Sequence, residues 1–309
     1  MSMADRRSSG GSSSAERISR SSDEGAYRDL PDRSRYGAGA PTRPLEPWFV
    51  ALDVDGTIMH QDETIDASVA DAVAAAVERG HLVTLATGRS WATTAPVLEH
   101  LGLEPEYVVC ANGAITMRRD ATVPGGYVRA HVETFDPTAV LERIRSFLPA
   151  GKFMVELPDG FRLYTTGMVE WNLDNAREVE FADLLDQRAT RVVVTSLEHE
   201  LDEFFGIVDQ MGLHHVSYAI GWTAWLDIAP DGVNKATALE RVRGWLDLPA
   251  DRVIAVGDGR NDLEMFSWAG AAGRSVAMGQ APDEVRAAAD EVTASIDEAG
   301  LAEVLDSLP

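Results

Sequence analysis

Two aspartates that stand two residues apart, Asp53 and Asp55, directly follow a short apolar run at 48–52. In extended backbone, residues two apart face the same side, so both carboxyl groups can enter one site. Gly56 comes next and allows the chain to turn away sharply. Two carboxylates within a few ångströms repel each other unless a cation lies between them or one of them holds a proton. The spacing therefore indicates a cation site or an acid–base pair, and the simpler alternative is an ordinary polar turn.

A second acidic turn follows another apolar run. Asp258 and Asp262 come after the run at 252–256, in a glycine-rich segment. If both runs are parallel strands of one sheet, their carboxyl ends meet at the same edge of that sheet. Four carboxylates at one edge favour a hard, oxygen-binding cation. Mg²⁺ fits best, because it usually keeps waters and a substrate phosphate among its ligands.

Two other interpretations of these acidic turns fail. An EF-hand loop beginning at Asp53 would need glycine at its sixth position and a bidentate glutamate at its twelfth, but the glycine is fourth and Thr64 is twelfth. The segment Gly257-Asp258-Gly259 resembles the start of a dinucleotide-binding fingerprint, yet Asp262 stands where the third glycine belongs.

Two further residues suit the oxygens of a phosphate group. Thr87 follows the apolar run 82–86 and offers a hydroxyl, while Lys235 opens a predicted helix and offers a compact cation. Each signal is weak alone, because a threonine in a turn and a lysine at a helix start are common on protein surfaces. Their order along the chain, together with the two aspartate turns, favours one shared site.

The elements that must position these residues alternate between strands and helices. This alternation, with polar residues just after each strand, predicts an α/β fold with a doubly wound parallel sheet and a site at its carboxyl edge. The predicted strands are 48–52, 82–86, 107–110, 252–256 and 275–277, and the predicted helices are 67–79, 91–101, 235–246, 263–268, 282–289 and 298–308.

The pattern also predicts how the chain divides. Between 114 and 231 strand-like and helical runs mix, which indicates an α+β cap domain inserted into the sheet domain. The catalytic core is then formed by 46–113 and 232–309. Residues 1–45 are rich in Ser, Arg and Gly and have too little apolar area to offset the entropy of ordering, so we expect a disordered tail.

Composition excludes several classes of partner. With 50 acidic and 27 basic side chains the chain has a formal charge of −23, which argues against nucleic-acid binding. No apolar run approaches the ~20 residues of a membrane span, and the N-terminus lacks the apolar core of a secretory signal. A single cysteine, Cys110, excludes an internal disulfide and fits a reducing, cytoplasmic location. The sequence carries no signal for an oligomeric state.

Four ordered motifs resemble those of the haloacid dehalogenase (HAD) superfamily. They are Asp-Val-Asp-Gly-Thr at 53–57, Ala-Thr-Gly-Arg at 86–89, Gly-Val-Asn-Lys at 232–235 and Gly-Asp-Gly-Arg-Asn-Asp at 257–262. The large insert, the turn at 112–114 and the segment 277–282 resemble the Cof-type phosphatases of this superfamily. One departure is Gln280, where asparagine is more usual. The resemblance covers about 48–308 and implies a Rossmann-like HAD core with an inserted cap.

The resemblance implies a Mg²⁺-dependent phosphatase that acts on small phosphorylated metabolites, sugar phosphates among them, through an aspartyl-phosphate. Asp53 would be the nucleophile, and Asp55 would protonate the leaving alkoxide and then deprotonate water. Mg²⁺ would be held by the Asp53 carboxylate, the Asp55 backbone carbonyl and Asp258, and Asp262 would orient the waters of the metal.

The same resemblance implies that Thr87, Asn261 and Lys235 hold the phosphoryl oxygens. Arg89 either reaches the substrate or anchors the loop behind Thr87. Two other functions stay open: a phosphomutase with the same aspartyl-phosphate chemistry, and a non-catalytic regulatory or binding protein on the same fold.

Overall fold

The computed structural model describes residues 47–168, 175–196, 198–213, 216–220 and 224–309. The predicted tail at 1–45 lies outside these residues. Within them, no helix is long and apolar enough to cross a membrane.

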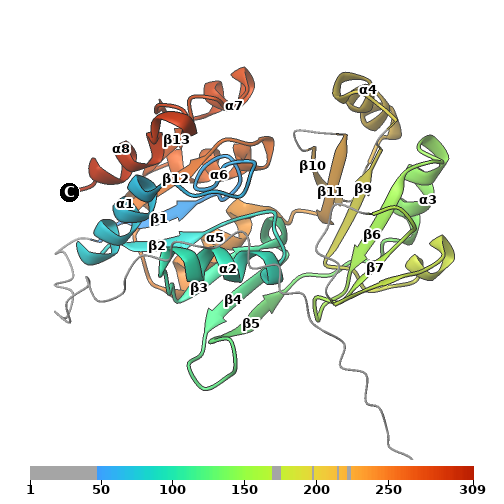
Figure 1. Ribbon diagram of the computed structural model, residues 1–309, viewed down its shortest axis with the longest axis horizontal. Coiled ribbons are helices and arrows are strands. Elements are labelled where there is room, and N and C mark those ends of the chain that lie inside the picture. The colour runs from blue at the N-terminus through green and yellow to red at the C-terminus, as the bar shows by residue number, and fades with distance from the viewer. Residues whose placement is uncertain (1–46, 169–174, 197, 214–215, 221–223) are drawn as a thin grey trace, which may run out of the picture. The chain divides into compact units, whose positions relative to one another are not determined.

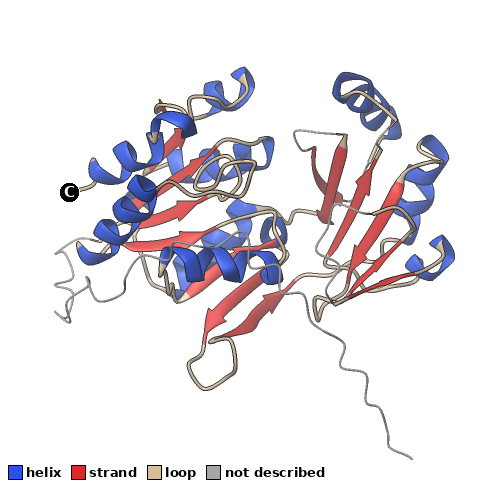
Figure 2. Ribbon diagram, viewed as in Figure 1, coloured by secondary structure: helices blue, strands red, loops and turns tan. Residues whose placement is uncertain are grey.

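A five-stranded parallel sheet of order β14-β13-β12-β1-β2 forms the core. Its strands are β1 (Phe49–Leu52), β2 (Leu82–Leu85), β12 (Val253–Gly257), β13 (Arg274–Ala277) and β14 (Glu291–Val292). Figure 1 labels β13, β12, β1 and β2 of this sheet, and Figure 2 shows strands in red and helices in blue. Because β1 lies between β2 and β12, the strand order reverses beside it, and such a switch point opens a crevice at the carboxyl ends of the strands. The predicted α/β fold with a doubly wound parallel sheet is confirmed.

Helices cover both faces of this sheet. On one face lie α1 (Ala67–Glu78), α2 (Trp91–Leu101) and α8 (Gly300–Asp306), and on the other lie α5 (Lys235–Trp245), α6 (Leu263–Gly270) and α7 (Asp283–Ala288). Alternate residues of β1 supply the two cores: Val50 and Leu52 face the first set of helices, while Phe49 and Ala51 face the second.

The predicted helix at 298–308 begins later than expected. Ala299 takes a left-handed φ of 57° and separates α8 from a short 3₁₀ turn, η6 (Ile296–Glu298). A left-handed residue cannot continue a right-handed helix, so the segment divides at this point.

The strand β3 (Tyr107–Cys110) differs from the expectation of a further parallel strand. Its link to the parallel sheet is a single parallel bridge between Ala86 and Val109. On its other side β3 pairs antiparallel with β4 (Ile115–Arg119), which pairs with β5 (Tyr127–Val132). The sequence pattern predicts that the inserted cap begins at 114. Because β4 and β5 pair with β3, the strand pairing favours a cap that begins after β5 instead. The division into core and cap stays a proposal.

A second, six-stranded sheet has the order β10-β11-β9-β6-β7-β8. Its strands are β6 (Lys152–Glu156), β7 (Arg162–Tyr164), β8 (Ala176–Glu178), β9 (Arg191–Thr195), β10 (Val216–Ile220) and β11 (Trp225–Pro230). Two helices, α3 (Thr138–Phe147) and α4 (Leu201–Met211), pack on one face through buried side chains such as Leu141 and Phe204. A short 3₁₀ turn, η3 (Phe181–Leu184), adjoins the same core.

Candidate active site

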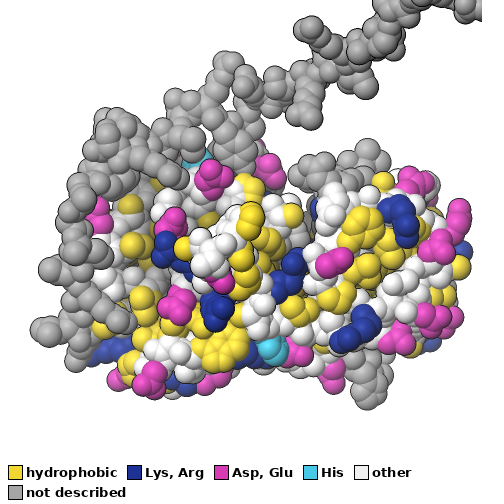
Figure 3. Space-filling model, turned by 90° about the horizontal axis from the view of Figure 1, so that it is seen from below, with side chains coloured by type: hydrophobic (Ala, Val, Ile, Leu, Met, Phe, Trp, Pro, Cys, Tyr) yellow, Lys and Arg dark blue, Asp and Glu magenta, His cyan; other side chains and the backbone are white. Residues whose placement is uncertain are grey.

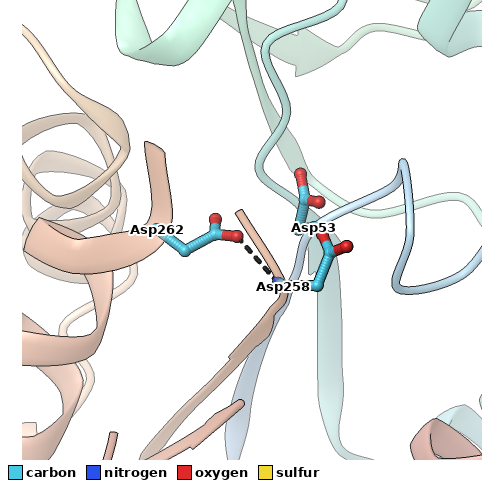
Figure 4. A group of neighbouring side chains, drawn as sticks. All are labelled: Asp53, Asp258 and Asp262. Carbon is cyan, nitrogen blue, oxygen red and sulfur yellow. Dashed lines mark hydrogen bonds between the residues drawn. The ribbon is translucent and has the colours of Figure 1, made fainter. Parts of the chain in front are cut away.

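The ends of two neighbouring strands bring Asp53 and Asp258 together. Leu52 and Val256 are register partners in β1 and β12, and the backbone N–H of Asp53 donates to the Val256 carbonyl at 2.9 Å. Each aspartate follows its strand, so both carboxyl groups project from the carboxyl edge of the sheet. Figure 4 shows them converging, with Asp262 approaching from the following turn, η5 (Arg260–Asp262).

A glycine makes this approach possible. Gly56 has a φ of 79°, and a Cβ there would lie 1.9 Å from Asp258 Oδ2. Any side chain at position 56 would therefore displace the Asp258 carboxylate. Position 56 therefore requires glycine for two reasons: a Cβ would collide with Asp258, and other residues rarely adopt a positive φ.

The Asp258 carboxylate has one weakly bonded oxygen and one without a partner. Gln280 Nε2 donates to Asp258 Oδ2 at 3.3 Å and to the Gly56 carbonyl at 2.6 Å. Asp258 Oδ1 is buried and has no hydrogen-bond partner among the described protein groups. A buried oxygen without a hydrogen-bond partner is energetically unfavourable, so we expect Asp258 Oδ1 to bind a ligand.

Lys235 is fully buried and joins two of the aspartates. Its Nζ donates to Asp53 Oδ1 at 2.5 Å and to Asp262 Oδ1 at 2.7 Å. A capping box between Asn234 and Thr237 begins α5 at this residue. A cation in the first turn of a helix opposes the helix dipole, so the two carboxylates must stabilise it.

Asp262 uses both of its oxygens within the protein. Oδ1 accepts from Lys235, while Oδ2 accepts the backbone N–H groups of Asp258 at 3.0 Å and Gly259 at 2.9 Å. These bonds hold the turn after β12 in shape and thereby fix the position of Asp258.

The pKa values of Asp53, Asp258 and Lys235 all lie above their ordinary values, although burial acts upward on the aspartates and downward on the lysine. Burial raises the pKa of Asp53 to about 7, although Lys235 opposes the shift. Burial and then the charges of Asp53 and Asp262 raise the pKa of Asp258 to about 8. Burial alone would lower the pKa of Lys235, but Asp262 and Asp53 outweigh it and hold the pKa above its ordinary value. The cluster therefore carries excess negative potential that a further cation can neutralise.

Three of these carboxylates can hold a metal ion. One oxygen from each of Asp53, Asp258 and Asp262 lies within 4.8 Å of the others, and all three side chains are buried. The unpartnered Asp258 Oδ1 and the all-oxygen donor set fit Mg²⁺, which prefers carboxylates and waters.

Asp55 stands apart from this cluster. Its side chain is 54% exposed, and both of its oxygens accept from Arg89: Nε donates at 2.9 and 3.1 Å and Nη2 at 2.7 Å. Of the two alternatives for Arg89, the geometry favours an anchor, but what it holds is the Asp55 carboxylate rather than the loop behind Thr87.

Thr87 and Asn261 lie at neighbouring loops. Thr87 is buried, and its Oγ1 accepts the backbone N–H of Arg89 at 3.1 Å. The loop of Asn112 separates the two residues: Asn112 N donates to the Thr87 carbonyl at 3.0 Å, and Asn261 Nδ2 donates to Asn112 Oδ1 at 3.0 Å.

Sequence reasoning missed the contacts of two residues. Gln280 stands where the resemblance expects asparagine, and its side-chain amide contacts Asp258, which the sequence did not indicate. Asn112 was treated as part of a turn, yet it contacts Asn261 and Asp227. The available signal for Asn112 was its place in the turn after a strand, two residues beyond Cys110, since Asp53 and Thr87 also come soon after strands.

The sequence profile of the haloacid dehalogenase-like hydrolases matches residues 50–305. Among curated relatives, a 5-amino-6-(5-phospho-D-ribitylamino)uracil phosphatase of Bacillus subtilis, YitU, is 27% identical over 84% of this chain and 97% of its own length. A phosphoglycolate phosphatase of Natronomonas pharaonis is 31% identical over 83% of this chain and 96% of its own length.

Solved structures share the fold at lower identity. The HAD subclass IIB sugar phosphatase BT4131 superposes with a TM-score of 0.69 at 20% identity, covering 84% of this chain and 98% of its own. The protein TM0651 of Thermotoga maritima superposes with a TM-score of 0.65 at 21% identity, covering 85% and 98%. Both similarities extend over the five-stranded and the six-stranded sheet.

Proposed function

The chain belongs to the haloacid dehalogenase-like hydrolase family, and on that premise we propose that it is a Mg²⁺-dependent phosphatase of small phosphorylated metabolites. The observation that carries the proposal is the buried cluster of Asp53, Lys235, Asp258 and Asp262 at the carboxyl edge of the sheet. Three buried carboxylates share a single ammonium group in this cluster, and buried acids that lack part of their counter-charge are costly unless they hold a ligand.

Asp53 is the nucleophile in this proposal. Its carboxylate oxygen attacks the phosphorus atom, the bond from phosphorus to the ester oxygen breaks, and the leaving alkoxide takes a proton from Asp55. Asp55 then accepts a proton from water, the water oxygen attacks phosphorus, and the bond to Asp53 breaks to release phosphate. The exposed position of Asp55 supports this role, because it can exchange protons with solvent. Arg89 donates to both Asp55 oxygens in this structure, so it must release one of them for that oxygen to carry the proton, while it continues to orient the carboxyl group through the other.

Asp53, Asp258 and the backbone carbonyl of Asp55 would hold Mg²⁺, with Asp262 fixing the turn that carries Asp258. When bound, the metal supplies positive charge that stabilises the phosphoryl oxygens.

Lys235, Thr87 and Asn261 bind the phosphoryl oxygens in this proposal. Lys235 is pre-oriented by its bonds to Asp53 and Asp262, so no reorganisation is needed as charge develops. Thr87 and Asn261 are uncharged donors of hydrogen bonds. Together they let a strongly acidic protein bind an anion.

The substrate is proposed to be a small phosphomonoester, with sugar phosphates as the leading class, and the reaction to be hydrolysis rather than phosphoryl transfer to a second sugar. The curated relatives named above are phosphatases of small phosphorylated compounds, which supports hydrolysis. A cytoplasmic location is part of the proposal, because the single cysteine fits a reducing compartment.

A phosphate-release assay tests the function. We expect the purified chain to release inorganic phosphate from several small phosphomonoesters with added Mg²⁺, without an added bisphosphate, and to lose this activity with a chelator. Release only when a bisphosphate is supplied would favour the mutase. No release from any ester, with Mg²⁺ binding intact, would favour the non-catalytic alternative.

The first variant to test is Asp53→Asn. It keeps the shape of the side chain but removes the nucleophile, so turnover should disappear while the fold persists by circular dichroism. Asp71→Asn, an exposed aspartate on α1, is the matched control and should keep parental activity. Appreciable phosphatase activity in Asp53→Asn contradicts the assignment of the nucleophile.

A further inference from the structure

Asn112 occupies a constrained turn between the predicted catalytic loops. It belongs to a short 3₁₀ turn, η2 (Ala111–Gly113), in which Ala111 and Asn112 have φ values of 50° and 49°. Left-handed backbone at two consecutive non-glycine residues is unfavourable and persists where the surroundings impose it. A Cβ on Gly88 would lie 3.2 Å from the Asn112 amide group, so the side chain packs against the Thr87 loop.

The Asn112 amide bridges two distant parts of the chain. Its Nδ2 donates to Asp227 Oδ2 at 3.0 Å, and its Oδ1 accepts from Asn261 Nδ2 at 3.0 Å. Asp227 belongs to β11 of the six-stranded sheet, whereas Asn261 belongs to η5, after β12 of the core sheet. Both groups of the Asn112 amide are therefore engaged in defined bonds.

Asp227 is itself fixed by a nearly buried arginine. Arg191 Nε donates to Asp227 Oδ1 and Arg191 Nη2 to Asp227 Oδ2, each at 2.7 Å, and the two side chains are 5% and 10% exposed. A two-point pair of this kind holds the carboxylate in one plane. Both Asp227 oxygens therefore act as acceptors of hydrogen bonds.

The direction of the remaining bonds follows from this carboxylate. An ionised carboxylate only accepts hydrogen bonds, so Asn112 must turn Nδ2 toward Asp227 and Oδ1 toward Asn261. Asn261 must then turn its own Nδ2 toward Asn112. An amide nitrogen carries two hydrogens, which leaves the second hydrogen of Asn261 to bind another acceptor.

We propose that Asn112 and Asp227 are positioning residues that orient the Asn261 amide so that its nitrogen, and not its oxygen, faces the substrate phosphoryl group. This inference rests on the proposed function and adds two residues to it. The affinity of the site for phosphate then depends on an ion pair in the six-stranded sheet.

Asp227→Asn tests the direction of the bonds. An amide at 227 can donate to Asn112, which lets Asn112 and Asn261 turn over and brings an oxygen toward the phosphate. We expect inorganic phosphate to bind the Mg²⁺-loaded chain about tenfold more weakly by calorimetry, as for a lost hydrogen bond to a charged group. The KM for a small phosphomonoester should rise by a similar factor.

The double variant Asn112→Asp with Asp227→Asn should restore affinity. The new carboxylate at 112 accepts hydrogen bonds from the amide at 227 and from Asn261. The hydrogen bond from Asn261 Nδ2 to residue 112 then has the same direction as in the parent. We expect recovery to within about threefold of the parent. A double variant no better than Asp227→Asn alone contradicts the proposal.

A cycle with Asn261→Ala separates positioning from a general structural effect. If Asp227 acts through Asn261, Asp227→Asn has no further effect on phosphate affinity once Asn261 is alanine. Additive losses, or an Asn261→Ala variant that binds phosphate like the parent, overturn the proposal.

If Asp227→Asn does not fold, Asn112→Ala takes its place in the cycle, because it leaves the Arg191–Asp227 pair intact. Asn175→Ala is its control, since Asn175 also has a left-handed φ, 59°, and directly precedes β8 of the six-stranded sheet. Weaker phosphate binding in both variants alike would contradict the proposal. A parent chain that hydrolyses no phosphoester contradicts the proposed function, whereas an active parent with an additive cycle contradicts this inference alone.

Discussion

Lys235 is one of only two lysines in the chain, and the 25 other basic residues are arginines. It is completely buried between Asp53 and Asp262, at the first residue of a helix where a cation is unfavourable. A compact ammonium fits between two carboxylates that a planar guanidinium would push apart. We infer that lysine occupies position 235 because it fits between the two carboxylates, and not because it suits the first turn of a helix.

Replacing Lys235 with methionine should damage both stability and turnover. The change leaves two buried carboxylates without their counter-ion, which costs about 3–5 kcal/mol of unfolding free energy. Loss of one preorganised positive group should lower kcat by roughly 10²–10³-fold. Thermal unfolding and steady-state kinetics measure the two effects. Lys152→Met, at the only other lysine, is the control, and equal rates for parent and Lys235→Met would exclude a role for Lys235 in the reaction.

The raised pKa of Asp258 predicts a pH dependence of the metal-free protein. Burial raises this pKa from 3.8 to about 8, so between these values the folded state binds a proton that the unfolded state has lost. The stability that the neutral form provides is complete below pH 3.8 and falls as the pH rises toward 8.

Asp258→Asn removes this dependence. In the presence of a chelator the variant should melt higher than the parent at pH 8, by roughly 5 °C, and the difference should shrink at pH 5. Added Mg²⁺ should raise the melting temperature of the parent at pH 8 and leave that of Asp258→Asn unchanged. Identical melting curves at pH 8 would show that the Asp258 carboxylate carries no excess charge in the folded state.

At the scale of elements, the turn η2 and the start of α5 are in direct contact. Gly113 has a φ of 101°, and a Cβ there would lie 2.2 Å from the carbonyl oxygen of Asn234, the residue before Lys235. Because the obstacle is backbone, a side chain at 113 must move the first turn of the helix or the loop itself.

Gly113→Ala should therefore shift Lys235 and lower activity, with a loss of unfolding free energy well above 1 kcal/mol. Gly125→Ala separates the two causes, because Gly125 also has a positive φ, 79°, but has nothing within 4 Å of the added Cβ. We expect only a backbone penalty in Gly125→Ala, with unchanged kcat/KM. Equal losses of activity in both variants would contradict the proposed contact.

The helix α2 occupies the predicted range 91–101, because apolar periodicity and the terminal glycine Gly102 are local signals. The parallel sheet was also predictable from the alternation of strands and helices, whereas the order of its strands was not. By contrast, the antiparallel pairing of β3 with β4 was missed, because the short apolar run at 107–110 fits an antiparallel strand as well as a parallel one.

Within the site, the types of residue were predictable, but their pairings were not. That aspartates follow β1 and β12 can be read from the sequence, whereas the bond between Asn112 and Asp227 joins residues 115 positions apart. The hydrogen bonds from Arg89 to Asp55 depend on side-chain geometry, so they could not be inferred from the spacing of these residues either.

At the scale of the molecule, the charge of −23 must be reconciled with an anionic substrate. On the face shown in Figure 3, acidic and basic side chains are interspersed and no large basic patch appears. The long-range electrostatic field of the protein therefore repels a phosphate ester. Attraction is confined to the immediate surroundings of Lys235 and a bound cation.

An increase in ionic strength should consequently lower the KM for a phosphomonoester. Raising salt from about 0.01 M to 0.15 M shortens the Debye length from ~30 Å to ~8 Å, which screens the distant surface charge more than the buried cluster. With Mg²⁺ kept saturating, we expect KM for a phosphomonoester to fall severalfold and kcat to stay constant. A substrate with a second phosphate should respond more strongly, because repulsion scales with its charge. A KM that rises with salt for both substrates would mean that attraction by the local site outweighs the field of the whole protein.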